Sequence, residues 1–360
     1  MNRIEERHID ANSAAALAKA GVPDELARTW GSPAGVQDRT VVLAWQDDTL
    51  RAAAFTSSRP LTAYLKIGAT WTHPESGPEA AEHLRRQLVG AIEERAWKRG
   101  LVSVKIQYHP SDPTAASDQA AGYTPWHTPQ MATPLPSASD HVPTGQVRWR
   151  TEPNLRPFPY VRQTTEFTCG PAALSMGLAG QGLIDSPSRQ LEIDMWRQAT
   201  SVGGHGGCDP YGLAVAAHHQ QAYADVWLST EDTILTEDVS TDADRDLKAF
   251  VQQDLRAAAK NAGHHVTAWF AIDELRTIVD SGKAAIVLID EDQMHTESCP
   301  HWILVHAYHD GAFIAHDPWT DSHLGESWLD GYNLPIRPEA LERLAQFGDP
   351  PYRSMVVLHV

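Results

Sequence analysis

Short runs rich in apolar and β-branched residues recur along the first part of the chain, and the last of them alternates between apolar and polar positions, which is typical of β-strands. These runs cover residues 40–45, 49–56, 62–70 and 101–108. Between the third and the fourth run, residues 79–99 follow a helical period with apolar side chains near one face, and Gly100 ends that segment. The pattern predicts three strands, a long helix and a further strand within a first domain, residues 1–130.

Proline and polar residues replace this regular pattern over residues 131–155, where little periodicity remains. Such a composition is typical of a connection between domains. We therefore expect an interdomain linker, in which Val147 and Trp149 are apolar positions available to pack on a surface.

Helical and strand-like segments alternate again in a second domain, residues 156–360. The expected helices are an apolar segment that begins at Cys169 and residues 188–200, 211–221, 244–261 and 272–279. The expected strands are residues 222–228, 284–289, 301–308 and 313–316. The uninterrupted apolar run at 284–289 is typical of a buried strand. We expect a domain that contains both helices and strands.

The composition indicates a globular, acidic protein. Of its 360 residues, 42% are hydrophobic and 21% charged, and the formal net charge is −17. An acidic chain does not suit nucleic-acid binding, which needs clustered Lys and Arg. The chain has only three cysteines, no secretory signal and no apolar run long enough to span a bilayer. We expect a soluble cytoplasmic protein.

One segment combines a candidate nucleophile with the start of a helix. Gln163 lies six residues before Cys169, and Gly-Pro-Ala-Ala-Leu follows the cysteine. Proline suits the first turn of a helix, and the positive end of the helix dipole favours the thiolate form of a cysteine placed there. The Gln163 side chain is suited to donate a hydrogen bond to an oxyanion beside the sulfur. We expect Cys169 to act as a nucleophile.

The base for such a nucleophile comes from a predicted hairpin. His301 begins one strand, a His-Asp-Gly turn occupies residues 309–311, and Asp317 ends the returning strand. This register brings His301 within roughly two residues of direct pairing with Asp317, which is contact distance. We expect Asp317 to orient the His301 ring, and His301 to hold the proton of Cys169.

Residues around these groups are candidates for substrate contact. The five assigned to substrate binding are His205, Gly207, Cys208, Trp302 and Trp319. For the two tryptophans, core packing is the first interpretation and a wall of the substrate site the second. For Cys208, the alternative is a place in a strained glycine-rich loop. A zinc site lacks the usual close ligand pairs, so we expect no metal, and we expect Cys299 to be a small buried residue.

The motifs that carry these residues resemble the peptidase C39 family and the standalone C39-like proteins beside it. They are Gln-x5-Cys-Gly-Pro-Ala-Ala-Leu, Gly-His-Gly-Gly-Cys-Asp-Pro-Tyr-Gly-Leu-Ala, Pro-His-Trp-Ile-Leu-Val and His-Asp-Pro. The resemblance implies an α+β, papain-like fold, in which the helix carrying Cys169 packs on an antiparallel sheet that carries His301 and Asp317. These three residues would form a catalytic triad. The resemblance also implies an oxyanion hole made by Gln163 and the Cys169 backbone N–H. Peptidases of this family that process double-glycine leaders are usually joined to transporter segments and an ATPase. Neither has a counterpart in this sequence, which puts leader processing in doubt.

The order of elements over residues 35–130 resembles, in layout, the acetyltransferase fold of the GNAT superfamily. In that family a glycine-rich loop before the long helix holds the acetyl-CoA pyrophosphate. The equivalent residues 74–80 contain two prolines, two glutamates and one glycine. Prolines lack an N–H donor and glutamates repel phosphate. We therefore expect a degenerate α/β domain that acts as a structural module, a partner-binding module or a specificity element for the second domain.

Together these features predict a cysteine-dependent hydrolase, a peptidase or amidase that works through an acyl-thioester intermediate. The same thioester chemistry also allows an acyltransferase or an amide ligase. A non-catalytic binding protein and acetyl transfer by the first domain are the remaining alternatives. We expect a peptide or small amide or acyl substrate, no cofactor, and no nucleic-acid or membrane partner. The sequence leaves the oligomeric state open.

Overall fold

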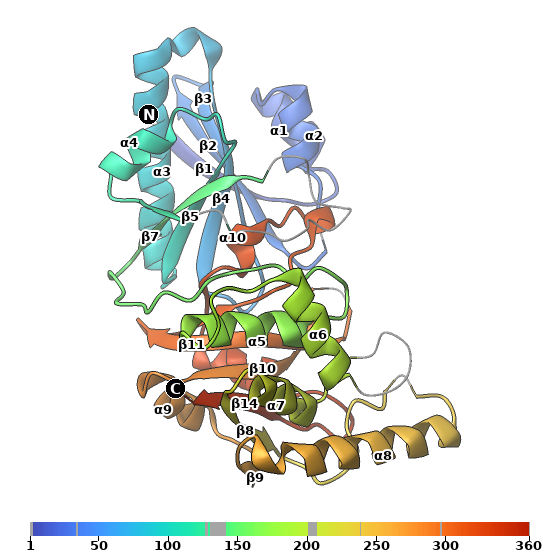
Figure 1. The fold of residues 1–360 in the computed structure, drawn as a ribbon. Coiled ribbons are helices and arrows are strands. Elements are labelled where there is room, and N and C mark those ends of the chain that lie inside the picture. The colour runs from blue at the N-terminus through green and yellow to red at the C-terminus, as the bar shows by residue number, and fades with distance from the viewer. Residues whose placement is uncertain are drawn as a thin grey trace. The chain divides into compact units, whose positions relative to one another are not determined.

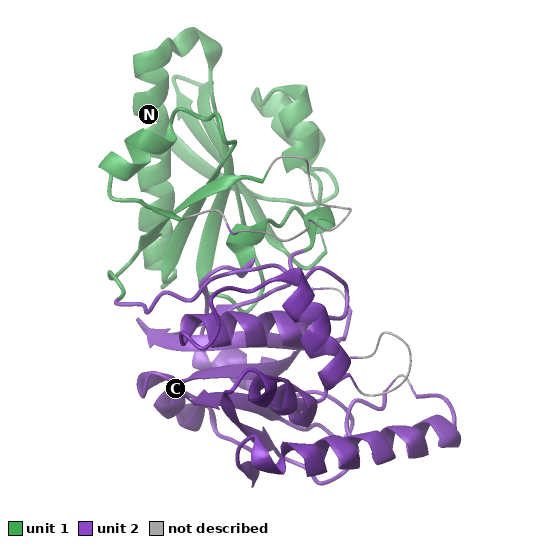
Figure 2. Ribbon diagram, viewed as in Figure 1, with its two compact units in different colours: residues 1–128, 138–153, 321–330 green, residues 129–137, 154–320, 331–360 purple. Residues whose placement is uncertain are grey.

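The computed structural model describes residues 3–33, 35–126, 129, 142–200, 207–237, 239–295 and 297–359. The chain forms two compact units (Figure 2). Unit 1 comprises residues 1–128, 138–153 and 321–330, and unit 2 comprises residues 129–137, 154–320 and 331–360. Each unit has its own sheet and helices, so the chain is α+β, as expected (Figure 1).

Unit 1 is built on a seven-stranded sheet with the order β1-β2-β3-β4-β5-β7-β6. Its strands are β1 (Arg3–His8), β2 (Asp38–Gln46), β3 (Thr49–Ser58), β4 (Tyr64–Thr72), β5 (Ser103–Tyr108), β6 (Thr124–Trp126) and β7 (Thr144–Trp149). Neighbouring strands are antiparallel except for β4 and β5, whose parallel ladder ends at Ile67 and Ile106. Both strands continue past that point without pairing to each other.

Unit 1 has two hydrophobic cores, and in each of them helices pack against the sheet. The helices are α1 (Ser13–Ala20), α2 (Asp24–Trp30), the 3-10 helix η1 (Pro74–Ser76), α3 (Pro78–Lys98), α4 (Ala115–Ala120), the 3-10 helix η4 (Ser322–Leu324) and α10 (Trp328–Gly331). Val42 and Ala44 of β2 pack with α3, whereas Val41 and Leu43 pack with α1 and α2. Successive strand residues point to opposite faces, so this alternation places helices on both faces of the sheet.

Residues 321–330 are the part of unit 1 that comes from the far end of the sequence. Glu326 accepts hydrogen bonds from the Arg59 guanidinium at 2.8 and 2.7 Å, and Asp330 pairs with Lys66. All four side chains are buried. Buried charges persist in proteins when they are paired and hydrogen-bonded, so these contacts hold the segment within unit 1.

Unit 2 is built on a second seven-stranded sheet, with the order β13-β12-β11-β10-β14-β8-β9. Its strands are β8 (Tyr223–Leu228), β9 (His265–Thr267), β10 (Ala284–Asp290), β11 (Pro300–His309), β12 (Ala312–His316), β13 (Leu334–Ile336) and β14 (Ser354–His359). All neighbours are antiparallel except β8 and β9.

The central helix of unit 2 is α5 (Cys169–Gly180), whose residues from Cys169 to Leu178 are all buried. A helix that is apolar all round is typical of a core position. Gly177 allows a close approach, because a Cβ there would lie 2.7 Å from the Leu358 side chain of β14. The other helices are α6 (Arg189–Ala199), α7 (Pro210–His219), α8 (Asp242–Ala258), η2 (Ala259–Asn261), α9 (Ile272–Asp280), η3 (Glu291–Gln293) and α11 (Pro338–Leu344).

The hairpin of β11 and β12 has a two-residue loop and one irregularity. Asp310 and Gly311 have φ angles of 49° and 77°, which is the left-handed conformation that such tight hairpin loops require. The pairing shifts between Val305 and Ala307, so His306 has no partner on β12 and forms a β-bulge.

The expected helices and strands are present, with small differences at their ends, where assignments vary in any case. Residues Thr144–Trp149, within the stretch expected to be a linker, instead form strand β7. Its residues Val147 and Trp149 are buried, which explains why this segment joins the sheet. Residues 130–141 of the expected linker lie outside the described residues. None of the helices in the described part of the chain is long and apolar enough to cross a membrane.

Candidate active site

Cys169 is the first residue of α5, as the sequence predicts, and its side chain is almost fully buried. Thr168 precedes it as the N-cap residue but makes no side-chain hydrogen bond to the helix. The first N–H groups of a helix lack intrahelical partners, so the start of α5 presents backbone donors beside the sulfur. Pro171 lacks such an N–H and occupies the first turn at no cost.

His301 and Asp317 are in contact, as the hairpin register predicts. Nε2 of His301 lies 2.7 Å from Oδ1 of Asp317, and both side chains are buried. The Cys169 thiol lies beside the His301 ring and contributes to its raised pKa. The structure therefore brings a thiol close to a hydrogen-bonded pair of imidazole and carboxylate.

The loop that carries Asp317 is held on several sides. The Tyr160 hydroxyl donates to the Asp317 backbone oxygen at 2.8 Å, and the Asp317 N–H donates to the Gly331 oxygen at 3.0 Å. The Trp319 N–H donates to Oδ1 of Asp317 at 2.8 Å. These bonds fix both the backbone and the carboxylate of Asp317 relative to the His301 ring.

Glu291 is a second carboxylate beside the His301 ring, and the sequence analysis did not identify it. Its Oε1 lies 3.8 Å from Nε2 of His301 and 3.1 Å from Nδ1 of His295. Burial by itself lowers the pKa of His301, but the charges of Glu291 and Asp317 and the hydrogen bonds to Asp317 and Cys169 raise it well above its usual value. The site therefore favours a protonated, positively charged His301.

The register of β10 and β11 contains a signal for Glu291 that the sequence analysis did not use. Asp290 pairs with Pro300, and the Glu291 N–H donates to the Cys299 oxygen at 3.1 Å. A carboxylate that directly follows a strand paired with the His301 strand must lie close to His301. Only the pairing of those two strands reveals this, because residues 291–299 separate them in the sequence.

Gln163 is buried and attached to the Asp317 loop. Its backbone N–H donates to the Pro318 oxygen at 3.0 Å, and its Nε2 donates to the Thr165 oxygen at 2.9 Å. An amide nitrogen carries two hydrogens, so one N–H of Gln163 remains available beyond the bond to Thr165. Among the described residues, its buried Oε1 has no hydrogen-bond partner.

The residues assigned to substrate contact differ in their surroundings. Trp302 and Cys208 are fully buried, and Nε1 of Trp302 donates to the Cys208 oxygen at 3.1 Å. Both approach Gly170, where a Cβ would lie 3.2 Å from each side chain. Trp302 thus takes the core-packing position that was its first interpretation. Gly207 and Trp319 are partly exposed, and His205 lies outside the described residues.

The expectation for Cys299 is wrong, because this residue is exposed rather than buried. It lies in the loop between η3 and β11, ahead of the first residue of that strand. Because Cys299 lies before the paired part of β11, the alternation of strand side chains between the two faces does not place it in the core. Its Sγ has a weak contact with the Pro300 oxygen at 3.8 Å.

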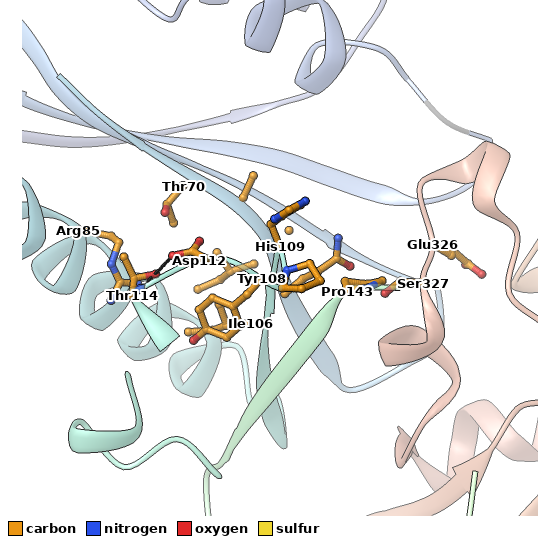
Figure 3. Close-up of a pocket in the computed structure, with 15 residues that line it drawn as sticks. Thr70, Arg85, Ile106, Tyr108, His109, Asp112, Thr114, Pro143, Glu326 and Ser327 are labelled. Carbon is orange, nitrogen blue, oxygen red and sulfur yellow. Dashed lines mark hydrogen bonds between the residues drawn. The ribbon is translucent and has the colours of Figure 1, made fainter. Parts of the chain in front are cut away.

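Unit 1 has a pocket of about 460 Å³ where β4 and β5 separate (Figure 3). Its labelled lining residues are Thr70, Arg85, Ile106, Tyr108, His109, Asp112, Thr114, Pro143, Glu326 and Ser327. Arg85 is already engaged by Asp118 at 2.9 and 2.8 Å and by Glu82 at 2.9 Å. The cation that lines this pocket is therefore neutralised by carboxylates of unit 1.

Comparison with known proteins identifies a family for the C-terminal part of the chain and similar solved structures for the N-terminal part. The sequence matches the Peptidase_C39 like family over residues 158–359. No curated protein matches the sequence. The family match points to an enzyme related to cysteine peptidases.

Solved structures of acetyltransferases are similar to the N-terminal part. The ribosomal-protein-S18-alanine N-acetyltransferase from Escherichia coli is 12% identical, with 42% of this chain and 99% of that chain covered and a TM-score of 0.29. The aminoglycoside 6'-N-acetyltransferase from Enterococcus faecium gives the same four values. For the spermidine/spermine N-acetyltransferase from Vibrio cholerae the identity is 9%, the coverage 41% and 95%, and the TM-score 0.30.

Proposed function

Because the chain belongs to the Peptidase_C39 like family, we propose that it is a cysteine-dependent hydrolase of peptides or other amides. The observation that carries the proposal is the buried, hydrogen-bonded pair of His301 and Asp317 beside the buried Cys169 thiol. A thiol at the start of a buried helix, next to an imidazole that a carboxylate orients, is the arrangement of papain-like enzymes. We assign it the same chemistry.

In the proposed reaction the Cys169 sulfur attacks the carbonyl carbon of the substrate. His301 holds the proton that the thiol loses and donates it to the leaving amine, while the sulfur keeps the acyl group as a thioester. Water then attacks the thioester while His301 takes a proton from that water as general base, and the carbon–sulfur bond breaks to release the acid and return the Cys169 thiolate. Asp317 holds the imidazole in the required tautomer, with Nε2 toward the carboxylate and Nδ1 left to face the sulfur.

Both steps pass through a tetrahedral oxyanion, which needs hydrogen-bond donors in a site that excludes water. The proposed donors are the second N–H of the Gln163 amide and the Cys169 backbone N–H at the start of α5. Two features support this role for Gln163. Its side chain is buried, and its other N–H is already committed to the Thr165 oxygen.

An acyltransferase or an amide ligase uses the same thioester, with an amine in place of water. The residues of the site are the same in both cases, so the two reactions differ only in the second nucleophile. Transfer is tested by supplying a panel of amines to the acylated protein. If free acid is the only product with every amine, the hydrolase is supported and the transferase is not.

The proposal is tested by intact-mass measurement after incubation with an activated ester or with cell extract. We expect an acyl adduct on Cys169 in the wild-type chain and no adduct in Cys169→Ala, with the same circular dichroism spectrum for both. A Cys169→Ala variant that retains full turnover would contradict the proposal. Failure of iodoacetamide to label Cys169 at neutral pH would instead favour a non-catalytic binding protein.

A further inference from the structure

Glu192 contacts both ends of the loop that joins Gln163 to Cys169. Its Oε1 accepts the Thr164 backbone N–H at 2.8 Å, and its Oε2 accepts the Thr164 hydroxyl at 2.9 Å. The Thr168 hydroxyl donates to Oε1 as well. Thr164 directly follows Gln163 and Thr168 directly precedes Cys169, so one side chain of α6 holds the neighbours of both proposed reaction groups.

An ionised carboxylate can only accept hydrogen bonds, so Glu192 sets the direction of the hydrogen bonds within this loop. Since Thr168 donates to Glu192, the Thr165 hydroxyl donates to Oγ1 of Thr168, 2.9 Å away. The Phe167 N–H donates to Oγ1 of Thr165 at 3.4 Å. The polar groups of the loop thus form one chain of hydrogen bonds that ends on Glu192.

The orientation of the Gln163 amide depends on the same loop. Its Nε2 donates to the Thr165 oxygen, and the position of Thr165 is set by its bond to Thr168. Helix α6 makes a second contact with the loop through Trp196, and the centroids of the Trp196 and Phe167 rings are 5.0 Å apart. The Gln163 amide, the Cys169 sulfur and α6 therefore form one connected arrangement.

We propose that Glu192 is a positioning residue that sets the distance between the Gln163 amide and the Cys169 sulfur and so aligns the oxyanion donor with the nucleophile. The inference rests on the proposed function. Glu192 touches neither the substrate nor the reacting atoms and acts through the loop.

The burial of Glu192 supports this role. Only 4% of its surface is exposed, and burial raises its pKa, although hydrogen bonds from Thr164 and Thr168 and the charge of Arg189 act in the opposite direction. A buried carboxylate is costly unless donors satisfy it. Three donors from a single loop meet this requirement and hold the loop to α6.

Two probes separate this role from general stabilisation. Alkylation by iodoacetamide forms no oxyanion, and it reports the reactivity of the Cys169 sulfur when it is followed on the Cys169 peptide, apart from the exposed Cys299. Acylation by p-nitrophenyl acetate passes through an oxyanion and reports its alignment with Gln163. The variants are Glu192→Ala, the isosteric Glu192→Gln, and Met195→Ala as a control that removes a fully buried side chain from the same helix.

We expect Glu192→Ala to lower the ratio of acylation rate to alkylation rate by about tenfold to a hundredfold, the cost of a donor misplaced by about 1 Å. Glu192→Gln should recover most of this ratio, because its amide oxygen still accepts the bonds of Thr164 and Thr168. Met195→Ala should change both rates by the same factor. If Glu192→Ala does not fold, Thr168→Val removes one donor with little change of shape and should lower the ratio in the same direction.

The outcomes distinguish this inference from the proposed function. Equal falls of both rates in Glu192→Ala, or a selective loss of acylation in Met195→Ala, would overturn the positioning role while leaving the hydrolase intact. A wild-type chain that is alkylated but never acylated at Cys169 would overturn both.

Discussion

Nε2 of His301 lies 2.7 Å from Oδ1 of Asp317, across a hairpin whose register is shifted by one residue. From the turn, His309 pairs with Ala312, and continuation of this register would place Asp317 on the face opposite to His301. The bulge at His306 changes the pairing, so that Leu304 lies opposite His316. Because side chains alternate between faces, this one-residue shift is what puts His301 and Asp317 on the same face.

The contact predicts unequal effects of substitution at the two residues. His301→Ala should lower the acylation rate of Cys169 by several orders of magnitude, because the proton acceptor is lost. Asp317→Ala should cost less, because the imidazole remains but its tautomer and orientation are no longer held. The measurement is the rate of thioester formation by stopped-flow absorbance, with Arg197→Ala, which removes an exposed side chain outside the site, as the control. A larger loss in Asp317→Ala than in His301→Ala would contradict the assigned roles.

The carboxylate of Glu291 predicts a shift in the titration of His301. Because Glu291 and Asp317 raise the pKa of His301 above about 6.5, the wild-type ring should stay protonated through neutral pH. Glu291→Gln removes one of the two negative charges and should move the titration to lower pH. The ring is followed by NMR in protein with carbon-13-labelled histidine. His306, whose pKa burial lowers well below the usual value, should stay neutral in both proteins and serves as the reference.

The raised pKa of His301 also predicts how the unfolding free energy depends on pH. A histidine that binds its proton more tightly in the folded state stabilises that state fully below its unfolded pKa of about 6.5, and this contribution is lost as the pH rises through the folded value. Glu291→Gln should therefore flatten the dependence of the unfolding free energy on pH above about 6.5. A His301 ring that titrates at or below that value in the wild type would contradict the electrostatic account.

The buried pair of Lys66 and Asp330 predicts a large effect on the stability of unit 1. Both side chains are almost fully buried, and Asp330 also accepts the Tyr64 hydroxyl at 2.7 Å. Removing one partner of such a pair costs about 3–5 kcal/mol, because the other charge stays buried without compensation. Lys66→Met should lower the free energy of unfolding in urea by this amount and increase hydrogen exchange in residues 321–330.

The control for Lys66→Met is an exposed pair. Arg197 and Asp194 are 3.0 Å apart with 64% and 42% of their side chains exposed, so Arg197→Ala should change the unfolding free energy by no more than about 1 kcal/mol. Equal effects of the two substitutions, or unchanged exchange of residues 321–330 in Lys66→Met, would show that the buried pair does not hold this segment.

The start of α3 predicts that unit 1 does not bind acetyl-CoA. Pro78 at the first helical position supplies no N–H donor, and Glu79 brings a negative charge into the first turn. The groove beside it is lined by Glu82 and Asp112, and its Arg85 is held by Asp118. Isothermal titration of the full chain with acetyl-CoA should show no saturable heat. Binding in the micromolar range would contradict this and revive acetyl transfer as an activity of unit 1.

Strand β1 is an element that local sequence pattern does not predict. It is rich in charge, with Arg3, Glu5, Glu6 and Arg7 in six residues. It forms because β2 offers an open edge, to which β1 pairs antiparallel over its whole length. Local sequence pattern also does not reveal that residues 321–330 belong to unit 1, because the ion pairs of this segment join residues more than 260 positions apart.

The sequence by itself determined the helix that begins at Cys169 and the hairpin with its turn at Asp310 and Gly311, whose two strands bring His301 and Asp317 near each other. These features follow from short-range chemistry: a proline in a first helical turn, residues that accept positive φ, and alternating strands. Only the tertiary structure decided the β-bulge, because bulged His306 is held by distant residues. Its Nε2 lies 3.1 Å from Oδ1 of Asn333, and its ring packs on Phe158. The tertiary structure also decided the role proposed for Glu192. That role depends on the loop that Glu192 contacts in the fold, which lies more than 20 residues away in the sequence.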